Sequence, residues 1–320
     1  RQHLREAADA LAAPRVELQA ALTILGRRSD ALCAFERGKG FSLDLRESDL
    51  RKTDLSEARL EHARLIEAKM EGANLREARM EGANLRGARM ERANLSGAQL
   101  DGANLHRAKM AHAYLHRANM DGADFGEANM EGADLASSKA RKAWFIDARM
   151  KDATVRRAEM EGTNLSQANM LGADLREVRL QNAYLFQARM EATDLREARL
   201  DKADVREATL DHGFFEAVSL KKTDLSDASS KGAALRSVDL SAPKDFHVAF
   251  AVEAFGDGSV TLPTTGDWAG LKPGEGRLAH WSALVLKDSA FYEAWRDWRR
   301  AEGLPWPPPG RALAFLSYRA

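Results

Sequence analysis

The chain has 320 residues, enough for one large domain or two ordinary ones with a sizeable buried core. Its 48 Lys and Arg residues balance 48 Asp and Glu residues, so net charge indicates neither a nucleic-acid binder nor an acidic protein that imitates DNA. The single cysteine, Cys33, excludes an internal disulfide framework and favours a reducing compartment, and no run of about 18 apolar residues could span a membrane.

Residues 1–40 are predicted to form a helical lead-in to the rest of the chain. Two amphipathic segments, at residues 2–12 and 16–27, are separated by Pro14. The second segment carries one apolar stripe, made of Leu18, Ala21, Leu22 and Leu25. The repeats that follow need a cover over their first unpaired edge, so we expect this segment to cap them.

A five-residue repeat occupies residues 41–242. From Leu45 to Leu240 an apolar residue, nearly always Leu, Met, Phe or Val, stands at every position ending in 5 or 0, forty centres in all, with Ala140 and Ser230 as the exceptions. A small residue, usually Ala, stands two places before nearly every centre. A period of five fits neither an amphipathic helix nor a flat strand. It predicts a coil that turns a corner every five residues.

The methionines indicate how many corners each coil has. All ten stand at centres ending in 0, whereas the centres ending in 5 are mostly Leu. In a coil of four faces and 20 residues Met stacks on Met and Leu on Leu, whereas three faces would alternate the two in every column. The sequence therefore predicts an all-β solenoid of square cross-section with about ten coils. Proline is absent from residues 15 to 242, as hydrogen bonding between coils demands.

The repeats resemble those of the pentapeptide-repeat family. That family's pattern is Ala, then Asp or Asn, then Leu, then two variable residues, and Ala-Asn-Leu occurs at residues 73–75, 83–85, 93–95 and 103–105. The resemblance covers about 200 residues. It implies a right-handed quadrilateral β-helix, and the handedness comes from the resemblance alone.

The C-terminal segment, residues 243–320, differs in composition from the repeats. It holds seven of the eight Pro and five of the six Trp residues. A helix is predicted near residues 290–302, with Phe291, Trp295 and Trp298 on one face. We therefore expect a small mixed region after the β-helix.

Two stretches outside the repeats resemble one group of pentapeptide-repeat proteins. The sequences QAALTILGRR at residues 19–28 and AFGDGSVTLP at residues 254–263, with His280 and Trp281, are similar to bacterial members that carry membrane helices at their amino terminus. The chain opens on Arg1 rather than Met. The resemblance implies the cytoplasmic part of a membrane-tethered bacterial protein, with the tether preceding Arg1.

Catalytic and cofactor motifs do not stand out from the repeats. The sequence from Gly256 to Gly258 lacks the other glycines of a phosphate-binding loop and is interpreted as a turn. The sequence has one histidine cluster, which comprises His106, His112 and His116. His106 and His116 are predicted to lie on opposite faces of the square and His112 near a corner, so the three side chains are not expected to bind one metal ion. The Met columns are interpreted as core. We therefore expect no enzyme, no cofactor and no metal.

The outer surface is predicted to be a ladder of opposite charges. On Leu-centred faces Asp or Asn precedes the centre and Arg follows it, as at Asn74 and Arg76, and on Met-centred faces the order is reversed, as at Arg89 and Glu91. Residues 41–240 contain 32 basic and 34 acidic residues. The best-known members of the family imitate DNA and bind gyrase, which needs rows of carboxylates with few cations between them. This surface disfavours that alternative, and no direct binding of nucleic acid is expected.

One aromatic patch interrupts the charge ladder. Trp144, Ile146, Tyr184 and Phe186 are predicted to point outward on the same face two coils apart, beside a basic rim of Lys139, Arg141 and Lys142. Three interpretations remain open: the chain's own ends cover the patch, the protein self-associates through it, or a separate protein binds there. The preferred hypothesis is a non-enzymatic structural and protein-interaction solenoid.

Overall fold

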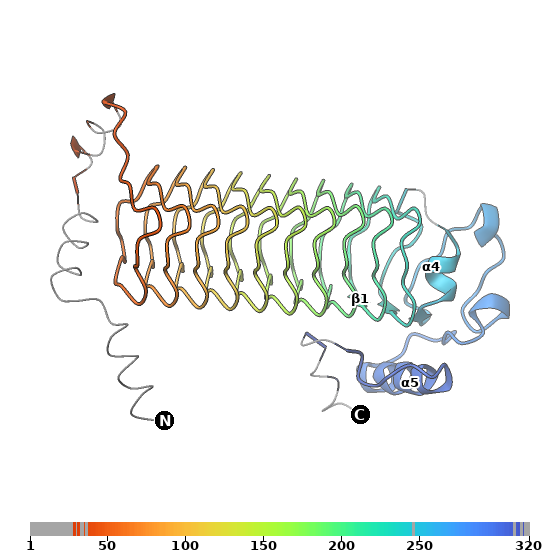
Figure 1. Ribbon diagram of the computed structural model, residues 1–320. Coiled ribbons are helices and arrows are strands. Elements are labelled where there is room, and N and C mark those ends of the chain that lie inside the picture. The colour runs from red at the N-terminus through yellow and green to blue at the C-terminus, as the bar shows by residue number, and fades with distance from the viewer. Residues whose placement is uncertain are drawn as a thin grey trace, which may run out of the picture. The chain divides into compact units, whose positions relative to one another are not determined.

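The computed structural model describes residues 28–29, 31–32, 35, 38–244, 247–309, 312–313 and 316 (Figure 1). Contacts within the chain divide it into two compact units, Arg1–Ala148 and Arg149–Ala320, and each has its own ladder of parallel pairs. The helices predicted at residues 2–12 and 16–27 lie outside the described residues.

The first unit is built of 20-residue coils. Each residue that precedes a centre pairs in parallel with the residue 20 positions later, from Asp44 with Arg64 to Asp124 with Trp144. The four faces of a coil therefore carry one short rung each. This confirms the predicted square coil, with Met-centred and Leu-centred columns stacked on themselves.

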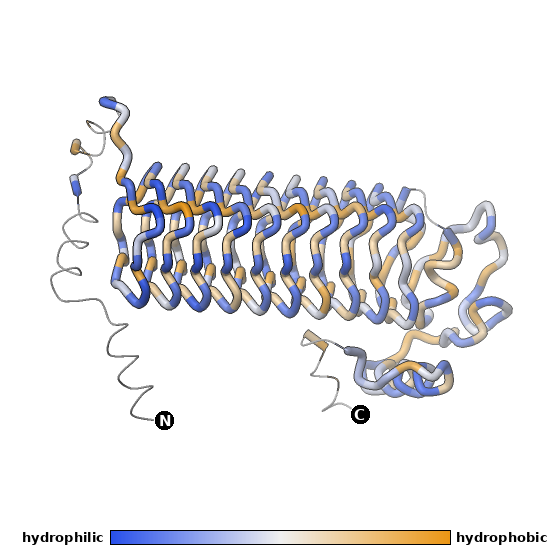
Figure 2. Tube along the Cα trace, viewed as in Figure 1, coloured by the Kyte–Doolittle hydropathy of each residue, from blue (hydrophilic) through white to orange (hydrophobic). Residues whose placement is uncertain are grey.

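Backbone hydrogen bonds between coils satisfy the polar groups of every rung. The N–H of Leu85 donates to the carbonyl oxygen of Asn104 over 2.7 Å, and the N–H of Asn104 donates back to Ala83 over 2.9 Å. Leu85 and Ala83 themselves are fully buried. Each rung is thus paired on both sides while its centre and small residue fill the core. In Figure 2 the hydrophobic colour recurs at matching positions of successive coils within a unit.

Every corner contains one residue in the left-handed backbone region. This is the second residue after a centre, such as Gly87 at φ 67° or Glu127 at φ 54°. The N–H of the third residue closes the turn on the carbonyl oxygen of the centre, as Ala88 does on Leu85 over 2.9 Å. A positive φ at this turn position is typical of a type II turn, which favours Gly. Glycine recurs at positions ending in 2 and 7 for this reason.

The second unit begins with the same coil and ends in a three-stranded parallel sheet. Single-residue pairs run from Arg149 with Asn169 onward. The sheet comprises β1 (Phe214–Glu216), β2 (Ala234–Arg236) and β3 (Phe255–Gly256), in that order. Because β3 pairs with β2, the parallel ladder continues beyond Leu240, where the five-residue pattern stops.

The outer edge of β3 is covered by the chain that follows it. The short helix α4 (Ala249–Val252) leads into β3. The indole N–H of Trp281 donates to the carbonyl oxygen of Ala254 over 2.8 Å, and the N–H of Ser282 donates to that of Gly256 over 3.2 Å. These bonds occupy groups that would otherwise form an open strand edge.

The helix α5 (Asp288–Ala301) packs against the outside of the coils of this unit (Figure 1). Two 3-10 turns, η1 (Gly266–Trp268) and η2 (Gly276–Leu278), precede it. Its apolar face joins a buried cluster with outward-pointing residues of the rungs, and the cluster comprises Ala192, Phe214, Ala234, Phe255, Phe291, Tyr292, Trp295, Leu313 and Leu316. The ring of Phe214 lies 5.7 Å from that of Trp295. The tail is therefore integrated into the second unit.

A buried arginine fastens α5 to the coil. Arg299 is fully buried and donates to the carbonyl oxygens of Gly232 over 2.6 Å and of Pro305 over 2.8 Å. Its guanidinium also lies 3.3 Å from Nδ1 of His212. Burial lowers the pKa of Arg299 to about 10.

The described residues contain no helix with the length and apolar character that a membrane span requires.

Candidate interaction surface

Ion pairs between successive coils occupy much of the first unit's outer surface. Arg79 Nε lies 3.1 Å from a carboxylate oxygen of Glu61, one coil earlier, and Arg89 lies 2.7 Å from Glu71 in the same arrangement. These arginines are about half exposed. Such pairs contribute little to stability individually, but they make the surface locally neutral.

One acidic column of the first unit changes sign at its last position. Glu61, Glu81, Asp101 and Asp121 follow the centres of one face at intervals of one coil, and Arg141 takes the next place. Burial and the neighbouring Asp121 raise the pKa of Asp101, as expected for stacked carboxylates. Arg141 therefore relieves repulsion in this column and reverses its charge.

Arg141 and its lysine neighbours form a local excess of positive charge. The backbone N–H of Arg141 donates to Asp121 Oδ1 over 2.8 Å, and its Nε and Nη2 reach Oδ2 over 2.9 and 2.5 Å. These contacts occupy both oxygens of Asp121, the carboxylate that would otherwise suit Lys139. Within the described part of the chain Lys139 and Lys142 form no ion pair, and both are exposed.

Trp144 stands beside these cations on the adjoining face. Its side chain is 57% exposed, and its backbone pairs with Asp124 on the rung below. Phe145 points inward and stacks on Phe125, with ring centroids 4.8 Å apart. Ile146 is half-buried at the next outward position. We call these five residues the Trp144 surface: Lys139, Arg141, Lys142, Trp144 and Ile146.

The other two predicted patch residues belong to the second unit. Tyr184 is 54% exposed. Phe186 is half-buried, because the guanidinium carbon of Arg206 lies 5.7 Å from its ring centroid. Arg206 is held in turn by Asp204 at 2.7 Å. The charge ladder thus covers part of Phe186, which the repeat pattern alone did not indicate.

The predicted patch is divided between the two units, so its continuity from Trp144 to Tyr184 stays a prediction. Within the second unit, the buried cluster under α5 includes Phe214. Phe214 follows Tyr184 by one and a half coils, so the two residues lie on opposite faces of the coil. The described part of the tail therefore covers the opposite face and leaves Tyr184 exposed.

Another exposed aromatic residue of the repeats lies outside the predicted patch. Tyr114 is 53% exposed and precedes a centre in the same way as Trp144. It lies one and a half coils earlier, hence on the opposite face of the first unit. Its neighbours are Lys109, Ala111 and His112 rather than a cluster of three cations.

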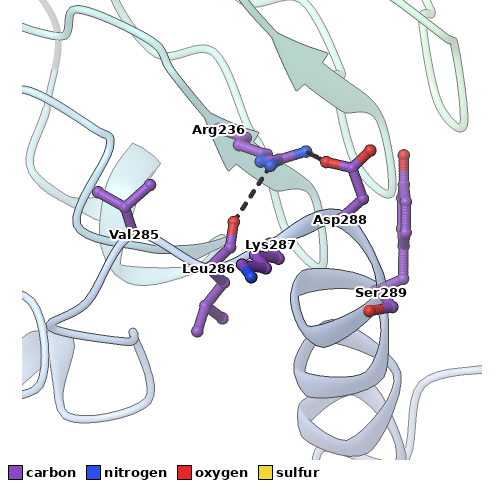
Figure 3. Close-up of a pocket in the computed structure, with 7 residues that line it drawn as sticks. Arg236, Val285, Leu286, Lys287, Asp288 and Ser289 are labelled. Carbon is purple, nitrogen blue, oxygen red and sulfur yellow. Dashed lines mark hydrogen bonds and ion pairs between the residues drawn. The ribbon is translucent and has the colours of Figure 1, made fainter.

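A surface pocket of about 800 Å³ lies at the start of α5 (Figure 3). Arg236 points into it and is held by Asp288 over 2.8 Å and by the carbonyl oxygen of Leu286 over 3.1 Å. Glu216 lies 2.8 Å from the same guanidinium. Because two carboxylates already neutralise Arg236, its guanidinium is not available to an anionic ligand. Among the described residues, no group of three or more His, Cys, Asp or Glu side chains could hold a metal ion.

A square coil whose core is filled by one centre and one small residue per face defines a solenoid repeat protein. The chain belongs to the pentapeptide-repeat family. The family model for pentapeptide repeats matches in eight copies over residues 44–82, 78–117, 98–136, 113–152, 143–182 and 173–211. Membership in this family implies that the β-helix of this chain is right-handed. Proteins of this family are generally non-enzymatic structural proteins that mediate protein interactions.

Several solved structures are similar to this chain. HetL from the cyanobacterium Nostoc sp. strain PCC 7120, described as involved in heterocyst differentiation regulation, shares 24% identity at a TM-score of 0.46, covering 65% of this chain and 98% of its own. A trypsin-treated variant of QnrB1, a plasmid-mediated fluoroquinolone resistance protein, shares 18% identity at a TM-score of 0.41, covering 61% and 92%. A pentapeptide repeat protein from the Arabidopsis thaliana thylakoid lumen shares 22% identity at a TM-score of 0.22, covering 35% and 67%. No curated protein matches the sequence.

Proposed function

We propose that this chain is a non-enzymatic structural solenoid that docks a protein partner through exposed aromatic residues. The observation that supports this most directly is Trp144, which is more than half exposed on a rung whose backbone is paired and whose neighbour Phe145 is locked in the core. A large apolar side chain on a rigid support is typical of an interface anchor.

Site-specific cross-linking tests this proposal. A photoreactive amino acid at position 144 in cells should yield one discrete heavier product, whereas the same residue at exposed position 109 should not. A product containing a second copy of this chain would favour self-association. Absence of any specific product at position 144 would contradict docking at Trp144.

We also propose that the chain is the cytoplasmic part of a bacterial protein tethered to a membrane by residues preceding Arg1. The support is the similarity of residues 19–28 and 254–263 to membrane-linked members of the family. Fractionation of the native protein, with its preceding residues restored, should place it in the membrane pool. Recovery wholly in the soluble pool would contradict the tether and leave the docking proposal standing.

The alternative function is modulation of gyrase by imitation of DNA, the activity of some other members of the family. The contacts of the first unit disfavour it, because Arg79 and Arg89 neutralise Glu61 and Glu71 on the outer columns. A DNA mimic needs carboxylates at the density of phosphates without intervening cations. Titration of the purified chain into a gyrase supercoiling assay should therefore leave supercoiling unchanged, and loss of supercoiling at low concentration would favour the alternative.

A further inference from the structure

The Trp144 surface combines an apolar anchor with a positive charge that its own coil does not neutralise. Asp121 is fully engaged by Arg141, and the two lysines beside it form no ion pair within the described residues. At the other described positions of this column in the first unit, Glu61, Glu81, Asp101 and Asp121 follow the centres, so within that unit Arg141 is where the column becomes positive. A binding partner that adds carboxylates here would complete the alternation of charge.

The two kinds of group lie on neighbouring faces that meet at a corner. Lys139 and Arg141 flank one centre, Lys142 occupies the corner with φ 56°, and Trp144 and Ile146 flank the next centre. An extended chain crossing this corner can place acidic side chains on the first face and an apolar side chain against the indole ring. Trp and Arg are enriched at the centres of protein interfaces for this combination of area and hydrogen bonding.

We propose that the Trp144 surface binds an acidic peptide segment of the protein partner, with Lys139 and Lys142 pairing with its carboxylates and Trp144 holding an apolar residue. This inference rests on the proposed docking function. It specifies the chemistry of the partner, which docking alone does not.

An anionic membrane surface shares the attraction to lysine and tryptophan, but the surroundings of Trp144 favour a peptide. Asp124 lies on the rung beneath Trp144, and Asp147 is exposed at the corner beyond Ile146. A flat anionic surface that reached the indole would also approach these carboxylates and be repelled. A narrow peptide can avoid both by following the corner.

The test is a titration of the purified chain against a fluorescein-labelled peptide of repeated Glu-Asp-Leu-Glu, followed by fluorescence anisotropy. A peptide with Lys in place of Asp and Glu serves as the charge control. We expect the acidic peptide alone to bind, more weakly as salt rises. Trp144→Ala, and Lys139→Glu combined with Lys142→Glu, should each weaken binding by about tenfold.

The chain offers a matched control on its opposite face. Lys109 and Tyr114 have the same spacing and a similar exposure to Lys139 and Trp144. Lys109→Glu combined with Tyr114→Ala should leave the affinity unchanged. Equal weakening by the control, or no weakening by the Trp144-surface variants, would overturn the proposal.

Two further outcomes also decide. Far-ultraviolet circular dichroism establishes that each variant is folded, and Lys139→Gln with Lys142→Gln supplies a milder change in which binding should weaken less.

Vesicles of phosphatidylglycerol and phosphatidylcholine replace the peptide in a parallel titration. Binding to these vesicles through Trp144, without binding to the peptide, would overturn the proposal in favour of a lipid surface. Cross-linking of a partner at position 144 that lacks an acidic segment would overturn it while leaving the docking function intact.

Discussion

His112 and Gly132 occupy the same corner in successive coils, and substitution of Gly132 by Ala should destabilise the protein through their contact. Gly132 has φ 64°, and a Cβ built on it would stand 2.5 Å from Nδ1 and 2.7 Å from Cε1 of His112. The added methyl group must therefore push the imidazole ring out of its place. Two separable costs follow, one from the backbone and one from the ring.

The backbone cost is about 1 kcal/mol, the usual penalty for placing Ala in the left-handed region. Displacing the ring adds only about 0.5–1 kcal/mol, because the His112 side chain is exposed and its imidazole can turn toward solvent. We expect Gly132→Ala to lower the free energy of unfolding by about 1.5–2 kcal/mol. Gly122→Ala is the control, because Gly122 has φ 67° but no atom within 4 Å of its Cβ position. It should cost only about 1 kcal/mol.

Urea unfolding, followed by far-ultraviolet circular dichroism, measures the free energy of unfolding of the parent protein and of four variants. These are Gly132→Ala, Gly122→Ala, His112→Ala, and His112→Ala combined with Gly132→Ala. The excess cost at Gly132 should disappear when the ring of His112 is absent. Equal costs at both glycines, or an excess that survives in the double variant, would refute the steric argument.

Three further predictions concern the core and the tail. Met130→Asp should cost at least about 3 kcal/mol, since Met130 is fully buried; loss of the circular dichroism signal measures it, with Met130→Leu as the control. Arg299→Ala should cost about 2–4 kcal/mol and make α5 sensitive to limited proteolysis, because it opens a cavity under α5 and removes the side-chain donors to the carbonyl oxygen of Pro305, whereas exposed Arg300→Ala should not. Burial and the adjacent Arg299 lower the pKa of His212, so on acidification the unfolded chain binds the proton first. Stability should be full above about pH 6.5 and fall as the pH drops through the folded pKa, and Tm measured from about pH 7.5 to about pH 5 should decline less in His212→Gln.

The coil itself could be predicted because its period is written in single residue types. A centre every five positions, and Met confined to alternate centres, requires faces of five residues and coils of 20, and the pairing of Asp44 with Arg64 has that spacing. The left-handed corner was not predicted, although Gly87, Gly97 and other glycines mark it. Many corners hold Glu, Arg or Lys instead, and those residues are rarely found at positive φ, so the signal is diluted.

The candidate surface could be predicted in part. Outward placement of Trp144 and Tyr184 follows from their position before a centre, and both are more than half exposed. Coverage of Phe186 by Arg206 depends on a side-chain choice one coil away. Coverage of Phe214 depends on the path of a tail more than 70 residues later in the chain. The five-residue period determines whether a side chain points inward or outward, whereas its exposed fraction also depends on which other side chains and segments pack over it.

The stack of Phe125 on Phe145 bears on how such a chain selects one alignment during folding. A repeat of uniform Leu and Ala could pair each coil with the wrong neighbour, because every shift by one coil would offer nearly the same contacts. The column containing these two rings holds Leu at 65, 85 and 105, so a shift by one coil would set Phe145 against Leu and lose the parallel stack at 4.8 Å. Singular pairs of this kind act as alignment marks in an otherwise degenerate sequence, and they favour growth of the solenoid outward from the coils that contain them.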